Sequence, residues 1–386
     1  MIPDDVLLMI PGPTNLPPQV REALGRPAFY HRGPHFAALL DECTRGLQQV
    51  FQTSNEVLIL TSSGTGAVEA AIVNVLSPGD RVLVIESGKF GERMREIAEA
   101  FGARVDRLVL EPGRAADPDD VAQRLDGHVA LLFVQNETST GVRQDADALA
   151  RVAREAGALV VVDTVSSMGG MPILTDEWGL DVVAAGSQKA LMLPPGLAFV
   201  SVSERAWRAA ETSQMPKYYF DLVAARKSLA KGQTPWTPNV SMIRALRASL
   251  ELIMAEGLEN VWRRHHALGE ATRAAIRAAS LELLADPAHA SDVVTAVKSP
   301  GGLDSTELVK RVLDRHGVLI SGGQGELKGK IFRIGHMGCC QLSDLLRTLQ
   351  AVGTELNEMG VAVPIADMLD AARAAYGAVA QAEMRT

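Results

Sequence analysis

Aromatic residues and cysteine are scarce in this chain of 386 residues. Phe, Trp and Tyr make up only 4% of it, so the core must be built mainly from Val, Leu, Ile, Ala and Met. The three cysteines, Cys43, Cys339 and Cys340, give neither a disulfide framework nor the spacing of a metal site. We therefore expect no bound metal, and we interpret the adjacent Cys339 and Cys340 as small core residues.

Long apolar runs and an excess of positive charge are also missing. No apolar stretch approaches the length of a bilayer span, and Met1–Asp5 lacks the basic and apolar regions that open a signal peptide. The net charge of -8 argues against nucleic acid or an anionic membrane as the main partner. We therefore expect a cytoplasmic, globular protein that binds neither.

Short apolar runs alternate with amphipathic stretches in the first half of the chain. The runs predict strands at Val57–Leu60, Arg81–Ile85, Arg104–Leu110, Val129–Val134, Leu159–Val162 and Val182–Ala185. The stretches between them predict helices at Ala67–Val75, Gly91–Phe101 and Ala146–Ala156. Such alternation is typical of an α/β fold with a mostly parallel sheet.

The pattern changes near the irregular segment Thr234–Asn239. A long helical stretch follows over 241–279, interrupted near Gly257, and then come fewer strands, at Val293–Val297, Val318–Ser321 and Ile331–Ile334. Met368–Met384 reads as a terminal helix, whereas the prolines of Met9–Pro18 predict an extended arm. We expect an N-terminal arm (1–18), a large domain (19–255) and a smaller α+β C-terminal domain (256–386).

Lys189 is the residue in this pattern that most needs a chemical explanation. It follows the apolar run Val182–Ala184 at a Gly/Ser turn, where partial burial would lower its pKa and favour the neutral, nucleophilic amine. Asp163 ends another apolar run, Leu159–Val162, so both groups are expected at strand ends. A lysine and a carboxylate that converge there suit pyridoxal 5'-phosphate (PLP), whose aldehyde needs an amine and whose ring nitrogen needs an acid.

Three further segments at strand ends could contact such a cofactor. Thr61–Ala67 could bind a phosphate at a helix N-terminus, although a tight turn with a helix cap explains the same residues. The polar cluster Gln135–Gly141 could bind a ring substituent or could be a capped loop. Phe90 could stack on a flat ring or could anchor its helix in the core. Their convergence at the carboxyl edge of the sheet favours a ligand site there.

With these residues in place, the chain resembles the class V, fold-type-I PLP-dependent aminotransferases of the alanine–glyoxylate, serine–pyruvate and aspartate–glyoxylate group. The matching motifs run through nearly the whole chain: Pro11–Asn15, Ser63–Gly66, Asn136–Gly141, Val162–Ser167, Gly186–Lys189, Pro194–Gly196 and Phe332–Gly335. The resemblance implies transfer of an amino group from alanine, serine or aspartate to glyoxylate or pyruvate by a ping-pong mechanism.

The resemblance also implies a role for each matching residue. Lys189 would form the Schiff base, and Asp163 would pair with the pyridinium nitrogen. The remaining cofactor contacts would come from Ser63, Gly64, Thr65, Phe90, Thr138, Val165, Gln188 and, from a neighbouring subunit, Thr237. Phe90 stands where relatives often carry Trp, and Thr65 stands where some carry His. Because Thr237 would reach across, the resemblance implies a homodimer with shared active sites.

Substrate binding is expected at three positions. Arg333, after the apolar pair Ile331–Phe332, would bind the substrate α-carboxylate, and Asn15 in the arm would help to complete that pocket. Arg32, in the His31–Arg32 pair, would let the site accept a second acidic group, as in aspartate; the alternative is a structural salt bridge or a solvated charge.

Three other functions compete with this interpretation. A cysteine desulfurase-like lyase shares the fold, but it needs a reactive cysteine on a mobile loop and usually a histidine before the lysine, where this chain has Gln188. A nucleotide-binding oxidoreductase would need a glycine fingerprint that is missing here. A catalytically silent binding protein would have no need of both Lys189 and Asp163.

Overall fold

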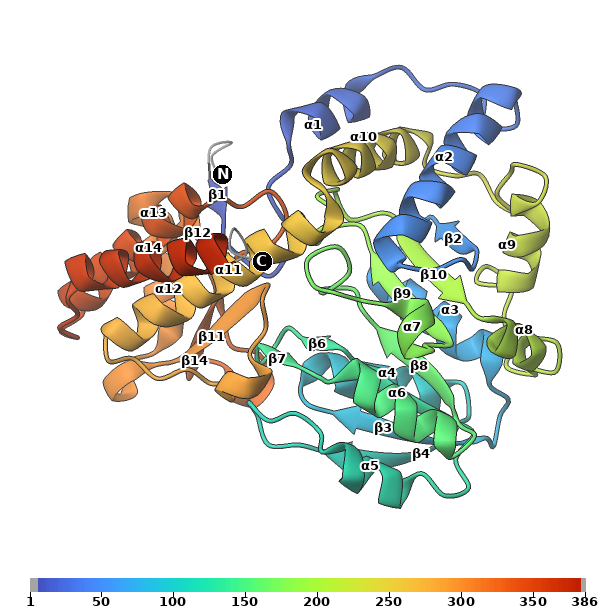
Figure 1. Cartoon of the computed structure of the whole chain (residues 1–386), viewed down its shortest axis with the longest axis horizontal. Coiled ribbons are helices and arrows are strands. Elements are labelled where there is room, and N and C mark those ends of the chain that lie inside the picture. Colours follow the sequence, from blue (N-terminus) through green and yellow to red (C-terminus); the bar gives the residue numbers. More distant parts are fainter. Residues whose placement is uncertain (1–5, 383–386) are drawn as a thin grey trace.

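A seven-stranded sheet forms the centre of the larger part of the molecule in the computed structural model, which describes residues 6–382 (Figure 1). Its strand order is β2-β10-β9-β8-β5-β3-β4. The strands are β2 (Val57–Leu60), β3 (Arg81–Glu86), β4 (Arg104–Val109), β5 (Ala130–Val134), β8 (Leu159–Asp163), β9 (Val182–Gly186) and β10 (Ala198–Val202). Only β10 runs antiparallel to its neighbours, so the other strands all end at one edge.

Helices cover both faces of this sheet because its strands are apolar on both sides. In β5, for example, Leu131 and Phe133 face one core, whereas Ala130, Leu132 and Val134 face the other. The first core is covered mainly by α2 (Pro34–Phe51), α5 (Pro118–Arg124), α6 (Ala146–Glu155) and α10 (Val240–Glu256). The second is covered by α3 (Gly64–Val75), α4 (Lys89–Ala100), α8 (Glu204–Ala210) and α9 (Leu222–Leu229). Runs that are buried on both faces are typical of parallel sheets.

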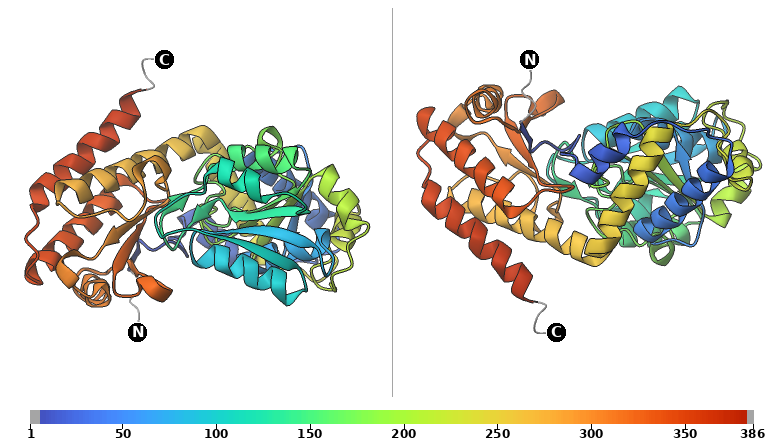
Figure 2. Two further views of the ribbon diagram at one scale, coloured as in Figure 1. Left: turned by 90° about the horizontal axis from the view of Figure 1, so that it is seen from below. Right: turned by 90° about the horizontal axis from the view of Figure 1, so that it is seen from above.

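A smaller sheet with its own core forms the second part of the molecule. Its strands β11 (Val294–Lys298), β14 (Ile331–Gly335) and β13 (Ser321–Gly322) pair antiparallel in that order. The helices packed around it are α11 (Leu258–Ala278), α12 (Ser305–His316), α13 (Leu342–Glu358) and α14 (Ile365–Ala382). Figure 2 shows α11 running from the larger part into the smaller one and α14 lying along it.

The N-terminal segment joins the two parts. Its strand β1 (Leu7–Leu8) pairs in parallel with β12 (Val318–Leu319), and Met9 lies fully buried in the core of the smaller part. The backbone of Met9 also donates to Leu319 and accepts from Gly335. The chain then passes to α1 (Pro18–Gly25), which packs on α10. The proline-rich segment that follows β1 therefore forms an arm between the smaller part and α1.

The predicted α/β fold with a mostly parallel sheet is confirmed. Each strand expected between residues 57 and 185 is present, within about one residue at its ends, and the long helical stretch divides at Gly257 into α10 and α11. The sequence interpretation missed β10, and the end of the expected helix Met368–Met384 lies outside the described residues. The division into an arm and two domains stays a prediction. No helix within residues 6–382 is long and apolar enough to cross a membrane.

We expect Phe199→Ala to destabilise the larger part strongly. Phe199 lies in β10 between β2 and β9 with its side chain fully buried, so truncation would leave a cavity and cost about 3–5 kcal/mol. Urea unfolding followed by far-ultraviolet circular dichroism measures the change, with Phe199→Leu as the milder control. Equal midpoints for Phe199→Ala and the unaltered protein would contradict the assignment of β10 to the core.

Candidate active site

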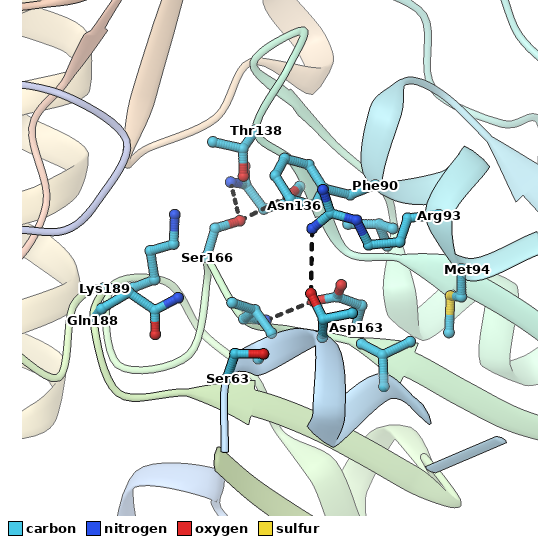
Figure 3. Close-up of a pocket in the computed structure, with 15 residues that line it drawn as sticks. Ser63, Phe90, Arg93, Met94, Asn136, Thr138, Asp163, Ser166, Gln188 and Lys189 are labelled. Atoms are coloured by element: carbon cyan, nitrogen blue, oxygen red, sulfur yellow. Dashed lines mark hydrogen bonds between the residues drawn. The ribbon is translucent and has the colours of Figure 1, made fainter. Parts of the chain in front are cut away.

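Loops from five strand ends meet in one pocket at the carboxyl edge of the large sheet (Figure 3). The pocket and its solvent-open mouth together hold about 560 Å³ of empty space. It is lined by Ser63, Gly64, Thr65, Val68, Phe90, Arg93, Met94, Val134, Asn136, Thr138, Asp163, Val165, Ser166, Gln188 and Lys189. Nine of the ten residues expected to contact a cofactor are therefore in one place, although their individual roles stay predictions.

Lys189 reaches the pocket from the turn after β9. Its side chain is only 9% exposed, and Nζ donates to the Pro11 carbonyl of the arm. The arm approaches so closely that a Cβ at Gly12 would lie 2.6 Å from the lysine Cδ, and Gly12 has a φ of +105°. Burial lowers the pKa of Lys189 to about 8, which Arg333 and Arg93 reinforce and Asp163 opposes. The neutral amine therefore becomes a large fraction near pH 8.

Asp163 is the last residue of β8 and is 6% exposed. Its Oδ1 accepts the backbone N–H of Val165 at 2.7 Å, which fixes the carboxylate at the strand end. Burial raises the pKa of Asp163 to about 6, a shift that Glu137 reinforces and Val165, Lys189 and Arg93 oppose. Figure 3 shows Asp163 and Lys189 on opposite sides of the pocket.

The start of α3 leaves hydrogen-bond donors open on the pocket wall. Its N-cap residue Ser63 makes no side-chain capping bond, so the first backbone N–H groups are free to bind an anion. A Cβ at Gly64 would lie 2.8 Å from Val165 Cγ2, which explains why glycine stands there. Gln188 Oε1 and Asn136 Oδ1 are buried and have no hydrogen-bond partner among residues 6–382. The lining therefore has both donors and acceptors available for a polar ligand.

Arg93 is a pocket residue that the sequence interpretation missed. It follows Phe90 by three residues on α4, and its guanidinium carbon lies 4.9 Å from the centre of the Phe90 ring. Its Nη1 also donates to Thr65 Oγ1 at 3.3 Å. The signal was present in the sequence, because positions i and i+3 share one face of a helix.

Arg333 lies in β14 of the smaller sheet, next to the pocket, with 4% of its surface exposed. Nη1 donates to the carbonyl of Thr138 at 2.9 Å, and Nε and Nη2 donate to that of Gly322 at 3.0 and 2.8 Å. Burial lowers its pKa to about 10, so the group remains charged at neutral pH. The pocket residue Thr138 is thereby joined to the smaller part of the molecule.

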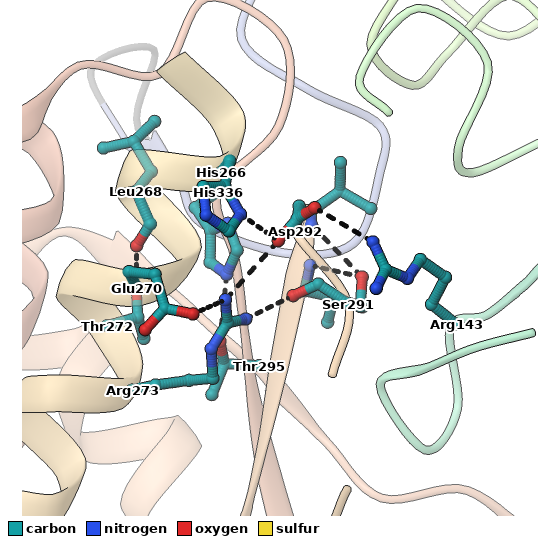
Figure 4. A network of polar contacts seen from close by, with 12 residues as sticks. Arg143, His266, Leu268, Glu270, Thr272, Arg273, Ser291, Asp292, Thr295 and His336 are labelled. Atoms are coloured by element: carbon teal, nitrogen blue, oxygen red, sulfur yellow. Dashed lines mark hydrogen bonds and ion pairs between the residues drawn. The ribbon is translucent and has the colours of Figure 1, made fainter. Parts of the chain in front are cut away.

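A partly buried polar network around Asp292 adds to this junction (Figure 4). Arg143, on the hairpin of β6 (Asn136–Glu137) and β7 (Val142–Arg143), forms an ion pair with Asp292 at 3.8 Å. Asp292 also contacts His266 at 2.9 Å and Arg273 at 3.4 Å, both of which lie on α11. The hairpin that carries Thr138 is therefore held by the smaller part from two sides.

Besides Arg333, three other predicted site residues do not line the pocket in this chain. Arg32 is exposed and donates to Gln233 Oε1 at 2.8 Å. Thr237 borders a separate cavity with Tyr219 and Trp236. The side chain of Asn15 makes two hydrogen bonds to the backbone of Leu8, which fix the fold of the arm.

The two adjacent cysteines are unsuited to thiolate chemistry. Burial raises the pKa of both the Cys339 and the Cys340 thiol, and Cys340 is only 3% exposed. Cys340 belongs to the core of the smaller part, as expected, and Cys339 donates to the carbonyl of Asn15. These two cysteines therefore give no support to a cysteine desulfurase-like reaction.

Comparison with known proteins agrees with this geometry. The family model described as aminotransferase class-V matches residues 7–348. The chain is also 38% identical to the L-aspartate–glyoxylate aminotransferase of Paracoccus denitrificans, over 96% of each chain. The chain belongs to the class-V aminotransferase family. Its enzyme class is therefore that of an aminotransferase, as the motifs indicated.

Two other similar proteins match nearly the whole chain. The soluble hydrogenase small subunit of Synechococcus sp. is 46% identical, with 92% of this chain and 94% of that protein covered. The crystal structure of pyridoxamine–pyruvate aminotransferase from Mesorhizobium loti superposes with a TM-score of 0.94 at 32% identity, covering 97% and 98%. The class-V fold expected from the sequence therefore extends over both parts of the molecule.

We expect Lys189 to titrate near pH 8 in the protein freed of small molecules. Competitive acetylation across a pH series, read by mass spectrometry of the Lys189 peptide, measures this midpoint. Asp163→Asn should lower the midpoint further because the negative charge that favours the ammonium is lost, and Arg333→Met should raise it. A midpoint near 10.5 in the unaltered protein would contradict the buried position of the amine.

Proposed function

We propose that this aminotransferase uses PLP, bound in the pocket of Lys189 and Asp163, to move an amino group from a small L-amino acid to glyoxylate or pyruvate. The observation that carries the proposal is the pair itself: a buried lysine with a lowered pKa and a buried carboxylate line the same pocket. Alanine, serine and aspartate are the proposed donors, in keeping with names borne by relatives, such as the serine–glyoxylate aminotransferase of Methylorubrum extorquens.

The residues present fit PLP at each of its polar groups. The uncapped start of α3, with Ser63, Gly64 and Thr65, would hold the phosphate together with Gln188, whose side-chain NH2 would donate to it. Phe90 would stack on one face of the ring and Val165 would pack on the other. Thr138 would bind the ring hydroxyl, and Asp163 would hold a proton on the ring nitrogen. When bound, the cofactor supplies an electron sink for the bond that breaks at the substrate α-carbon.

The chemical work of the protein centres on Lys189. Its Nζ would carry the cofactor aldehyde in the resting enzyme and, once released by the amino donor, would take the proton from the substrate α-carbon. A lowered pKa serves both tasks because each needs the neutral amine. The keto acid leaves before the acceptor enters, so the two half-reactions follow one another in ping-pong order.

Arg333 would bind the α-carboxylate of both substrates. A guanidinium held by two backbone carbonyls is already oriented, which favours recognition of a planar carboxylate. The arm near Asn15 would close this part of the site, since Pro11 and Gly12 lie against Lys189.

We also propose a cytoplasmic homodimer with shared sites. Arg32 and Thr237 lie outside the pocket of their own chain, and the exposed rings of Tyr218 and Tyr219 stack against Trp236 beside Thr237. Clustered exposed aromatic rings favour association. In the dimer Thr237 would reach the cofactor phosphate of the partner, and Arg32 would approach the partner's substrate.

We expect Lys189→Ala to lower turnover by at least about 10³-fold, because general base catalysis and the covalent link are both lost. The visible absorbance of the lysine-linked cofactor should disappear as well. Lys298→Ala removes an exposed lysine paired with Glu282, and should leave both unchanged. Full activity of Lys189→Ala would refute the assignment.

A half-reaction screen with alanine, serine, aspartate and glutamate tests the donor class and the role of Arg32. We expect Arg32→Ala to lower kcat/KM for aspartate by about tenfold or more and to spare alanine, because only aspartate has a second carboxylate. Arg45→Ala, which removes another exposed arginine from the same region, should change neither. Equal losses on both donors would show that Arg32 does not select the substrate.

A further inference from the structure

The N-terminus of α4 cannot cap itself. Its N-cap residue is Gly88, which has no side chain, so the first backbone N–H groups of the helix need acceptors from elsewhere. This helix end matters to the site because it carries Phe90 in its first turn and Arg93 one turn later.

Glu137 supplies those acceptors from the neighbouring strand end. Its Oε2 accepts the N–H groups of Phe90 and Gly91 at 3.0 and 3.1 Å, and its Oε1 accepts the N–H and hydroxyl of Ser139 at 3.0 and 2.5 Å. The Ser139 hydroxyl in turn accepts the N–H of Lys89 at 3.0 Å. The first three N–H groups of α4 are thus bound by two residues of a different loop.

The carboxylate of Glu137 is fully buried, and no ion pair involves it among residues 6–382. Burial raises its pKa, and the hydrogen bonds from Ser139, Gly91 and Phe90 oppose that shift. The positive end of the α4 dipole also favours the charged form. Such a buried group is costly unless it is fully hydrogen-bonded, and here four donors reach it.

The glycines around this contact show how tightly the two loops fit. A Cβ at Gly88 would lie 2.3 Å from Ser139 Oγ and 2.7 Å from carbon atoms of Glu137. A Cβ at Gly91 would lie 2.7 Å from the carbonyl oxygen of Ile85. The backbone at the start of α4 and the side chain of Glu137 are therefore in van der Waals contact. A shift of Glu137 must then move the start of α4.

Both sequence neighbours of Glu137 line the pocket. Asn136 before it and Thr138 after it line the pocket, and the carbonyl of Thr138 accepts from Arg333. Its bonds to α4 set the backbone of Phe90, on whose ring Arg93 stacks. One buried carboxylate thus joins the proposed ring-stacking residue to the hairpin that touches the proposed carboxylate-binding arginine.

We propose that Glu137 is a positioning residue for cofactor binding: it sets the ring of Phe90 and the loop of Thr138 against the cofactor from behind the pocket wall. The inference rests on the proposed PLP chemistry. A plain helix cap would stabilise α4 and leave ring orientation alone, whereas a positioning residue must also change how the cofactor is held.

Glu137→Gln tests the proposal with little change in volume. The new amide NH2 must face N–H donors on one side, so at least one of the two loops loses its anchor. We expect the Kd for PLP to rise about tenfold and the visible circular dichroism band of bound PLP to weaken, because the ring is held less rigidly. In a Phe90→Ala background, Glu137→Gln should change the Kd for PLP little further, because both variants disturb the same contact between Phe90 and the cofactor.

Asp181→Asn is the matched control at the opposite edge of the same sheet. Asp181 is also a buried carboxylate, 4% exposed, and it accepts from the N–H of Val160 at 2.9 Å and from Ser203 Oγ at 2.8 Å. Unlike Glu137, it also forms an ion pair with Arg205. This variant should lower the unfolding temperature yet leave the Kd for PLP and the dichroism band unchanged.

The outcomes separate the alternatives. Unaltered PLP affinity and dichroism in Glu137→Gln would overturn the inference, and so would equal effects with and without Phe90. If Glu137→Gln fails to fold, Ser139→Ala removes the bonds to both Lys89 and Glu137 and should shift Kd and the band in the same direction; no shift would overturn the inference. An unaltered protein that binds no PLP would instead refute the proposed function.

Discussion

The site depends on the burial of one lysine amine at the carboxyl edge of a parallel sheet. Lys189 can be buried because the arm supplies the Pro11 carbonyl as a partner and Gly12 leaves room for its side chain. The same burial lowers its pKa, which ties the fold of the arm to the reactivity of the amine. Since the arm is also paired with β12 and bonded to Gly335, the smaller part of the molecule helps to hold the lysine.

Two polar contacts connect the larger and the smaller part of the molecule near the Lys189 amine. Arg333 binds the carbonyl of Thr138, and Arg143 pairs with Asp292, so the β6–β7 hairpin is held from the smaller sheet. On its other side the hairpin holds α4 through Glu137. Hydrogen bonds on both sides of the hairpin thus connect the smaller sheet to the backbone of Phe90. Buried hydrogen bonds of this kind favour one arrangement, because each broken bond leaves a buried polar group unpaired.

Much of this arrangement could be predicted from the sequence, because the polar residues of the site directly follow the apolar runs that form the strands. Apolar runs indicated the strands, and the polar groups after them, Lys189, Asp163 and Thr138, converge because parallel strands end at one edge. The antiparallel strand β10 was missed, since its run Ala198–Val202 follows the turn of Lys189 without an intervening helix.

Other features depend on tertiary contacts that local patterns do not encode. In the sequence, Glu137 is one of several polar residues in the cluster Gln135–Gly141. Its special position depends on four hydrogen-bond donors that only the fold brings to it, three of them backbone N–H groups. Arg32 and Thr237 lie outside the pocket of their own chain, so their proposed roles depend on a second subunit. The place of Arg93 beside Phe90 could have been predicted, because residues three positions apart lie on the same face of a helix.

Reductive trapping tests the central claim most directly. The purified protein is incubated with PLP, treated with borohydride and digested, and the modified peptide is mapped by mass spectrometry. We expect a single pyridoxyl group on Lys189, the one lysine that lines the pocket within residues 6–382. A label on another lysine, or no label at all, would contradict it.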